Sequence, residues 1–151
     1  MNNPDLWPTP LIVPSLAYSD VPRAIDFLTR AFGFRERPGA RLWGTGWMLT
    51  WLEIGDALIH LATAGGHDIH SPSDVGRSTQ SLKVYVDDID GHFARAKAAG
   101  AVIISEPADM FWGGRIYRAK DHEGHHWEFS QIGCELAAKH WKLPDGVHRE
   151  D

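Results

Sequence analysis

Apolar residues near the N-terminus follow a strand pattern and then a helical one. After a proline-rich lead-in at residues 1–10, residues 11–18 form a mostly apolar run that predicts a strand. Asp20, directly behind this run, is a typical helix cap. Gly33 predicts the end of the helix, because it follows a set of apolar residues with helical spacing: Ala24, Ile25, Phe27, Leu28, Ala31 and Phe32.

The segment after this helix predicts further strands. Residues 34–37 form a short apolar and charged run that ends at a Pro-Gly pair, which is typical of a turn. Residues 43–54 and 57–63 predict a hairpin that turns at Gly55. The first part of the chain is therefore expected to form a βαβββ unit.

The same order of elements then occurs a second time. Asp88 lies 68 positions after Asp20, and Glu128 lies 68 positions after His60. The predicted elements of this second copy are a strand at 81–86, a helix from Asp88 or Asp90, and strands at 102–105, 115–119 and 125–131. A repeat of this length indicates two copies of one supersecondary unit. It divides a single domain of residues 1–151 into module one at about 11–64, a linker at about 65–80, module two at about 81–131 and a tail at 132–151.

The composition limits the classes of protein that remain. The chain has 151 residues, of which 43% are hydrophobic, so it is long and apolar enough to form a core and is not a disordered chain. Its formal net charge of −5 disfavours nucleic acid as a partner, because phosphate binding needs a basic surface. The N-terminus lacks a signal-peptide pattern, and no run approaches the roughly 18 apolar residues of a membrane span. With a single cysteine, Cys134, the sequence predicts a soluble cytoplasmic protein with no membrane partner.

Several segments resemble the vicinal oxygen chelate superfamily, which includes glyoxalase I, extradiol dioxygenases, fosfomycin-resistance enzymes and bleomycin-resistance proteins. The matching pieces are residues 20–34, Gly100-Ala101, Trp112-Gly113-Gly114-Arg115 and Asp121-His122-Glu123-Gly124-His125. The Trp-Gly pair ahead of an Asp-x-x-Gly hairpin is most similar to the bleomycin-resistance branch, although His122 stands where proline is usual. The resemblance covers about four-fifths of the chain.

The resemblance implies an α+β fold. It consists of two tandem βαβββ modules with pseudo-twofold symmetry, whose mixed sheets curve into a ligand cleft with the helices outside. Members of the superfamily commonly form homodimers, and their cleft is built either within one chain or across a swapped dimer. Because this fold hosts many reactions, it does not by itself identify the chemistry.

The resemblance also implies where a metal would bind. Metal-dependent members use one position on the first strand and one on the last strand of each module, which fall here at Val13, His60, Ser81 and Glu128. Valine has no lone pair, and a serine hydroxyl is a poor ligand for zinc, iron or nickel. His126 shares a strand face with Glu128 and offers a third ligand, although from a position that the superfamily does not normally use. We therefore expect no cofactor, with a divalent metal at His60, Glu128 and His126 as the alternative.

His60 and Glu128 also have roles that need no metal. They can form a hydrogen bond or ion pair with each other that lines the cleft. His60 can instead act as a general base that Glu128 orients, because the unperturbed pKa of histidine lies near 6.5. The sequence leaves both roles open, and these two residues are its candidate catalytic pair.

Tryptophans recur every four residues in the segment predicted as a strand. At this even spacing Trp43, Trp47 and Trp51 share one face with Glu53. If this face lines the cleft, the rings form an aromatic wall that stacks on a flat ligand. The alternative is that they fill core against the helix or a partner chain.

Other candidate ligand-binding residues lie in module two. Lys83 and Tyr85 share a strand face with Ser81, and Lys83 is suited either to an anionic or carbonyl-bearing ligand or to pairing with Glu128 or Glu53. The remaining candidates are Trp112, which the loop places over a pocket or a dimer seam, with Arg115 and His126.

The sequence therefore favours a small-molecule binding protein of the bleomycin-resistance type. It would hold an aromatic or amphipathic ligand by sequestration, without a catalytic metal. The alternative is a metal-dependent lyase, isomerase or dioxygenase that uses His60, Glu128 and His126. A third hypothesis is a non-catalytic protein whose cleft binds another protein.

Overall fold

The computed structural model describes residues 7–150, so the first six residues of the predicted lead-in and Asp151 lie outside it. The chain divides into two compact units, residues 1–76 and residues 77–151. Each unit has its own sheet and helix, in the α+β arrangement that the repeat predicts. No helix within the described residues is both long enough and apolar enough to span a membrane.

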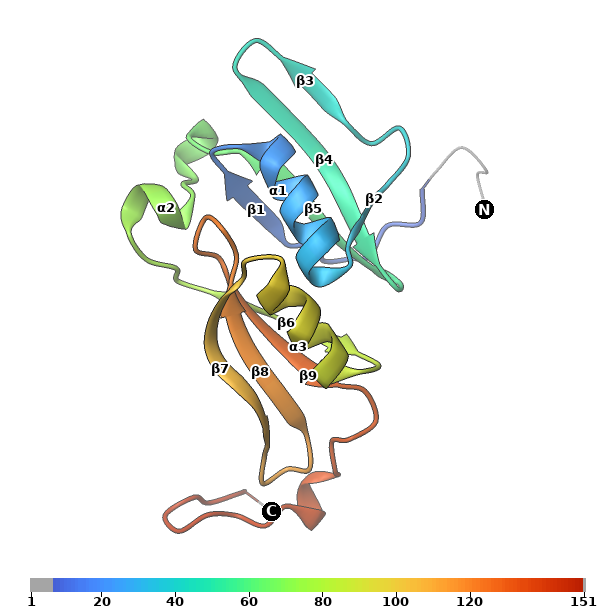
Figure 1. The fold of residues 1–151 in the computed structure, drawn as a ribbon, viewed down its shortest axis with the longest axis vertical. Helices are drawn as coiled ribbons and strands as arrows, with labels where there is room; N and C mark the ends of the chain where they lie inside the picture. The colour runs from blue at the N-terminus through green and yellow to red at the C-terminus, as the bar shows by residue number, and fades with distance from the viewer. Residues whose placement is uncertain (1–6, 151) are drawn as a thin grey trace. The chain divides into compact units, whose positions relative to one another are not determined.

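Unit 1 contains a mixed sheet in the order β1-β5-β4-β2, with β3 also paired to β4 (Figure 1). β1 runs parallel to β5, and the other pairs are antiparallel. The elements are β1 (Ser15–Tyr18), α1 (Val21–Phe27), η1 (Leu28–Phe32), β2 (Arg35–Glu36), β3 (Leu42–Gly44), β4 (Trp47–Ile54), β5 (Ala57–Thr63), η2 (Gly66–Asp68) and α2 (Pro72–Val75).

Unit 2 repeats this plan with a sheet in the order β6-β9-β8-β7. β6 runs parallel to β9, as β1 does to β5. The elements are β6 (Ser81–Val86), α3 (Ile89–Ala98), β7 (Val102–Asp109), β8 (Arg115–Lys120), β9 (His126–Gln131) and η3 (Ala138–His140). The predicted duplication of a βαβββ unit is therefore confirmed, with β3 added in unit 1.

The predicted helix caps are also confirmed. The Asp20 carboxylate accepts a hydrogen bond from the Arg23 backbone N–H at 3.0 Å, and the Asp88 carboxylate accepts one from the Gly91 N–H at 3.1 Å. Such caps satisfy N–H groups that have no partner within the helix. α1 continues into η1, a single π-helical turn, which ends at Gly33 with a left-handed φ of 82°.

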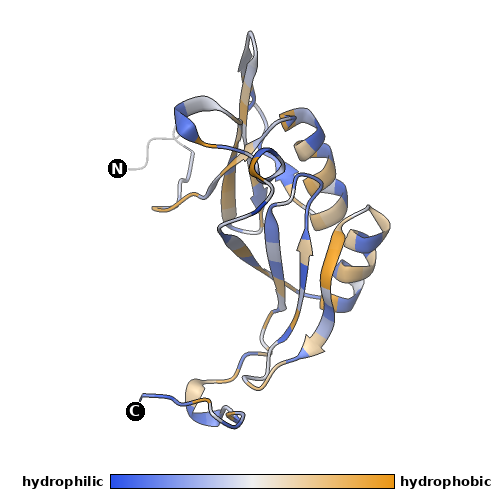
Figure 2. Ribbon diagram, turned by 90° about the vertical axis from the view of Figure 1, so that its left-hand side faces the viewer, coloured by the Kyte–Doolittle hydropathy of each residue, from blue (hydrophilic) through white to orange (hydrophobic). Residues whose placement is uncertain are grey.

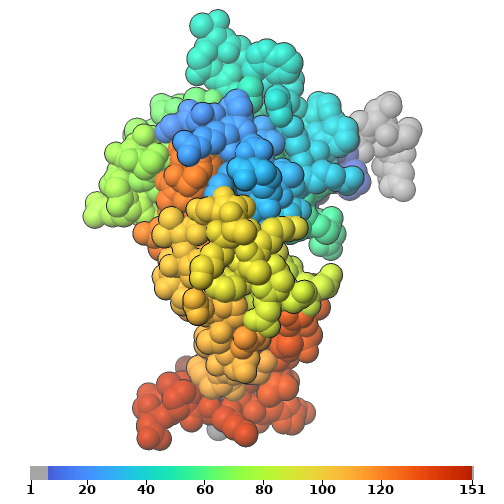
Figure 3. Space-filling model, in the orientation of Figure 1, coloured from blue at the N-terminus to red at the C-terminus, as the bar shows by residue number. Residues whose placement is uncertain are grey.

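One face of each sheet packs against the helix of the same unit. In unit 1 this face is fully buried at Leu16, Tyr18, Leu52 and Leu61, and α1 contacts β4 and β5. In unit 2 α3 packs on the side of the sheet where Tyr117, Trp127 and Phe129 lie buried, with Phe93 in edge contact with Tyr117. Figure 2 shows hydrophobic and hydrophilic residues alternating along both helices, as an amphipathic helix requires. In Figure 3 the yellow atoms of α3 lie in front of part of unit 2, and orange atoms of its later strands remain visible.

The Asp-x-x-Gly hairpin between β8 and β9 is held by a buried carboxylate. Asp121 is 2% exposed and accepts hydrogen bonds from the backbone N–H groups of Glu123 and His125, at 3.0 and 3.1 Å. Its second oxygen accepts one from the Trp127 indole N–H at 3.0 Å. This side chain therefore links the turn to the core of the sheet.

Three sequence-based boundaries were wrong. The first strand begins at Ser15 rather than at residue 11, so Val13 precedes β1. The strand predicted at 102–105 continues as β7 to Asp109, through Pro107. β7 is an edge strand with register shifts. Such a strand tolerates proline, which has no backbone N–H, because its outer side forms no hydrogen bonds with a neighbouring strand.

The third error concerns the segment predicted as one strand at 43–54. It is a hairpin of β3 and β4 with a turn at Gly46, whose φ is 77°. Glycine adopts this left-handed conformation without steric cost, which allows the tight turn.

Candidate functional site

The face of the unit 1 sheet turned away from α1, here called distal face 1, brings together Ser15, His60 and Trp51. Ser15 lies opposite His60 in the pairing of β1 with β5, and Trp51 lies opposite His60 in the pairing of β4 with β5. The Ser15 hydroxyl oxygen lies 2.8 Å from His60 Nδ1. The Trp51 and His60 ring centroids are 4.8 Å apart, with the rings tilted by 51°.

His60 lies in a surrounding that favours its neutral form. Its side chain is half-buried, and burial lowers its pKa from the ordinary value of 6.5. The Ser15 hydroxyl donates to Nδ1 in the tautomer that carries its proton on Nε2. A neutral imidazole at this position can accept or donate one hydrogen bond to a ligand without carrying charge.

A hollow of about 180 Å³ adjoins this group. It is lined by Ser15, Ala17, His60, Ala62, Thr63, Gly66, His67 and Ile69. Most of these side chains are small or apolar, so the hollow suits an uncharged part of a molecule.

The predicted wall of three tryptophans was wrong in one member. Trp43 lies on β3 opposite Met48, whereas Trp47 and Trp51 point to the other face of β4. The turn at Gly46 reverses the chain between them, so the even spacing from Trp43 to Trp47 does not place these rings on one face. Trp47 is 48% exposed, and Trp51 is half-buried with Trp7 in edge contact at 6.3 Å.

The Glu53 carboxylate, on the same face as Trp51, is neutralised within unit 1. It forms ion pairs with Arg35 and Arg37, and the hydrogen bond from Arg35 lowers its pKa. From the sequence, Glu53 is one candidate partner for Lys83. In the structure Glu53 is paired with two arginines of its own unit.

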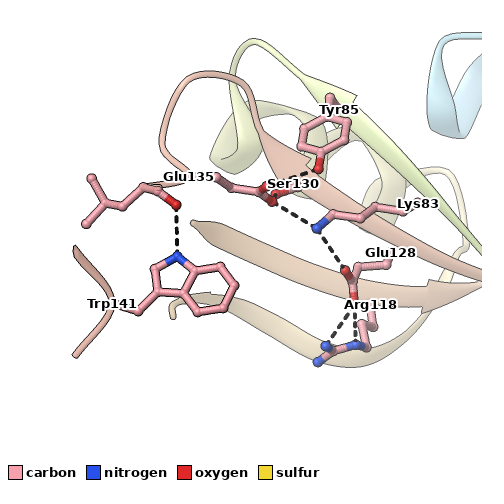
Figure 4. Close-up of polar contacts among 8 residues, drawn as sticks. Lys83, Tyr85, Arg118, Glu128, Ser130, Glu135 and Trp141 are labelled. Carbon is pink, nitrogen blue, oxygen red and sulfur yellow. Dashed lines mark hydrogen bonds and ion pairs between the residues drawn. The ribbon is translucent and has the colours of Figure 1, made fainter. Parts of the chain in front are cut away.

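The face of the unit 2 sheet turned away from α3, here called distal face 2, carries charge instead. Lys83, Glu128 and Arg118 lie opposite one another on β6, β9 and β8 (Figure 4). Arg118 donates through Nε and Nη2 to Glu128 Oε2, each at 2.8 Å. Lys83 Nζ lies 3.7 Å from Glu128 Oε1, which is one of the pairings that the sequence left open.

The C-terminal tail adds a residue to distal face 2 that the sequence reasoning missed. The Glu135 carboxylate accepts hydrogen bonds from Lys83 Nζ at 2.8 Å, Tyr85 OH at 3.1 Å and Ser130 Oγ at 3.2 Å (Figure 4). The bond from Lys83 lowers the pKa of Glu135, and the same bond raises the pKa of Lys83. No local pattern in the tail signals this contact, since Lys83 and Tyr85 lie about 50 residues earlier in the chain.

The structure separates the other predicted ligand-binding residues. His126 shares distal face 2 with Glu128, because it lies two residues earlier on β9. Arg115 points to the opposite, α3 side, where it pairs with Asp90 and Asp109 at 3.0 Å each, so it does not share distal face 2 with Lys83. The Trp112 carbonyl accepts a hydrogen bond from the Leu136 N–H at 2.7 Å, which ties the loop to the tail.

Comparison with known proteins identifies the family. Residues 11–129 match the model of the Glyoxalase/Bleomycin resistance protein/Dioxygenase superfamily. The chain belongs to this superfamily. Membership confirms the predicted resemblance and the vicinal oxygen chelate fold, and it leaves the branch within the superfamily open.

Individual proteins and solved structures resemble the chain over most of its length. A protein of Mycobacterium bovis, described as uncharacterized, is 31% identical over 129 residues, which are 81% of this chain and 83% of the relative. The crystal structure of TioX from Micromonospora sp. ML1 is 33% identical with a TM-score of 0.61, covering 83% of this chain and 98% of that one. Glyoxalase I from Zea mays has a TM-score of 0.64 at 21% identity over 78% of this chain and 42% of its own, and this likeness shows the fold alone.

Three of the four positions at which the resemblance implies metal ligands carry poor donors in this chain, and only His60 is an ordinary metal ligand. Val13 has no lone pair, Ser81 offers only a hydroxyl, and the Glu128 carboxylate is engaged by two cationic side chains. Within residues 7–150, no group of three or more His, Cys, Asp or Glu side chains is arranged to hold a metal ion. These residues therefore do not form the donor set that a catalytic zinc site uses.

Proposed function

We propose that the chain is a small-molecule binding protein of the bleomycin-resistance type that holds a planar, largely apolar ligand on distal face 1 without a catalytic metal. The observation that carries the proposal is the contact of Trp51 with His60 beside the hollow of about 180 Å³. An aromatic ring, a neutral imidazole and a small apolar hollow together favour a flat molecule with few charges.

The polar atoms of this face orient the ligand, whereas its apolar contacts supply most of the affinity. Stacking on Trp51 contributes on the order of 1 kcal/mol beyond the burial of apolar area. The ring nitrogen of His60 that does not face Ser15 can hydrogen-bond a hydroxyl or carbonyl of the ligand. Such a ligand is sequestered and leaves unchanged.

A panel of planar aromatic compounds, titrated calorimetrically into the purified chain, tests the proposal. The best compound should bind with one site per chain, and Trp51→Ala should weaken it at least tenfold. Trp43→Ala is the matched control, because Trp43 is 67% exposed on the other face of the same hairpin. Equal effects of the two substitutions, or no binding by any member of the panel, would overturn the proposal.

The metal-dependent alternative, a lyase, isomerase or dioxygenase at His60, Glu128 and His126, has less support. Two nitrogens of Arg118 donate to Glu128 Oε2 and Lys83 lies 3.7 Å from Oε1, so a metal would compete with two cations for this carboxylate. The His60 Nδ1 atom is likewise engaged by the Ser15 hydroxyl. We therefore do not assign a reaction to this site.

We further propose that the protein acts in the cytoplasm as a homodimer. The support is the superfamily resemblance for the dimer and the single cysteine, Cys134, for the reducing compartment. Light scattering on the purified chain should give twice the mass of 16.9 kDa. A mass equal to one chain at micromolar concentration would contradict the dimer.

A further inference from the structure

The Glu135 carboxylate occupies an anion site on distal face 2 that residues of the sheet form. The donors are a lysine ammonium and the hydroxyl groups of Tyr85 and Ser130, all within 3.2 Å of its oxygens. They come from β6 and β9, which are neighbouring strands, whereas Glu135 follows β9 in a segment without regular structure. The site is therefore built by the sheet, and its occupant comes from the tail.

The donors are held in place by contacts that do not involve Glu135. The Lys83 ammonium lies 3.7 Å from Glu128 and 5.2 Å from the centre of the Tyr85 ring. Ser130 is fully buried in β9. Removal of Glu135 would leave these groups in position, so another carboxylate would meet donors that are already oriented.

Two hydrogen bonds close to Glu135 hold the tail in place. The Leu136 N–H donates to the Trp112 carbonyl at 2.7 Å. The Trp141 indole N–H, labelled in Figure 4, donates to the Leu136 carbonyl at 2.8 Å. The red tail also lies beside the orange loop between β7 and β8 in Figure 3. The Glu135 side chain itself remains 34% exposed, so it can leave the site without opening the core.

The charge around the site favours a single carboxylate. Lys83 supplies one positive charge, and the negative charge of Glu128 beside it is balanced by Arg118. One net positive charge therefore faces the site, and a monocarboxylate matches it in charge and matches the Glu135 group in size.

We propose that Lys83, Tyr85 and Ser130 form a binding site for the carboxylate of a small organic acid, and that Glu135 fills this site until the acid displaces it. The inference does not depend on the proposed function, which uses the sheet of unit 1. Glu135 then acts as an intramolecular competitor that sets how tightly an external acid binds.

Nuclear magnetic resonance on the full-length chain with sodium benzoate tests this proposal. Glu135→Ala should bind benzoate about tenfold more tightly than wild type, because the competing charge-assisted hydrogen bonds are gone. The chemical shifts of Tyr85 and Ser130 should report the binding. Glu150→Ala, which removes an exposed tail carboxylate, should bind like wild type.

Further variants and ligands sharpen the test. Adding Lys83→Met to Glu135→Ala should abolish benzoate binding, and inorganic phosphate should bind more weakly than benzoate at neutral pH. Thermal melts of each variant verify that it is folded. The proposal is overturned if folded Glu135→Ala binds benzoate no more tightly than wild type, or if the Lys83→Met double variant retains that binding.

Discussion

The Ser15 hydroxyl lies 2.8 Å from His60 Nδ1, across the parallel pairing of β1 with β5. Lys83 and Glu128 occupy the corresponding positions of unit 2, each 68 residues later, across the parallel pairing of β6 with β9. The two units therefore share the register between their first and last strands, but the side chains at the equivalent positions differ. Unit 1 carries an uncharged hydrogen bond at this position, and unit 2 carries an ion pair.

The pH dependence of stability should report the lowered pKa of His60. As the pH falls below about 6.5, the unfolded chain takes up a proton at this residue while the folded chain resists it. This side chain therefore costs stability as the pH falls from its ordinary pKa toward its lowered one, by at most about 1.4 kcal/mol per pH unit.

Urea unfolding of wild type and His60→Gln between pH 8 and pH 5 measures this effect. The difference in unfolding free energy between the two proteins should be constant above pH 7 and should shift in favour of the variant at lower pH. A difference that stays constant over the whole range would show that the His60 pKa is not lowered by folding.

Replacement of Asp121 should destabilise unit 2 strongly. Asp121→Ala removes the acceptor of hydrogen bonds from Glu123, His125 and Trp127, at a cost of about 3 kcal/mol. Thermal unfolding followed by circular dichroism measures the loss. Asp145→Ala, at an exposed tail position, is the control and should change stability by less than about 0.5 kcal/mol. Similar melting temperatures for the two variants would refute the role of Asp121.

The approach of the tail to the Trp112 loop should depend on Gly113. This residue has a φ of 87°, and an added Cβ would lie 2.6 Å from Leu136 Cγ and 2.7 Å from the Cys134 carbonyl oxygen. Gly113→Ala should therefore loosen the tail in addition to the roughly 1 kcal/mol cost of an alanine with positive φ.

Gly146 provides a matched comparison for Gly113. Its φ is 79°, but an added Cβ would meet open space, so Gly146→Ala carries the backbone cost alone. Limited proteolysis should cleave the tail of Gly113→Ala faster than that of Gly146→Ala. Equal cleavage rates would mean that the close contact with Leu136 does not hold the tail.

The parts of the fold with local signals could be predicted from the sequence. Asp20 and Asp88 mark helix starts because their short carboxylates reach backbone N–H groups of the first turn. The repeat offset also predicted that His60 and Glu128 are equivalent, although their partners on the first strands are Ser15 and Lys83 rather than Val13 and Ser81.

The errors arose where tertiary context decides. Even spacing placed Trp43 with Trp47 and Trp51, but the turn at Gly46 puts it on another strand and another face. Glu135 could not be assigned from spacing, since its partners Lys83 and Tyr85 lie about 50 residues earlier. A contact between a tail and a sheet is set by packing, which no local pattern encodes.

Ligand binding on distal face 1 without a metal can be tested by comparing metal-free and zinc-loaded protein. The affinity of the best planar compound is determined with protein stripped by a chelator and again after one equivalent of zinc is added, with elemental analysis of each sample. The same dissociation constant is expected in both, with well below one divalent metal per chain after purification without chelators. Binding that requires a stoichiometric metal, lost together with that metal in His60→Ala, would contradict binding without a metal.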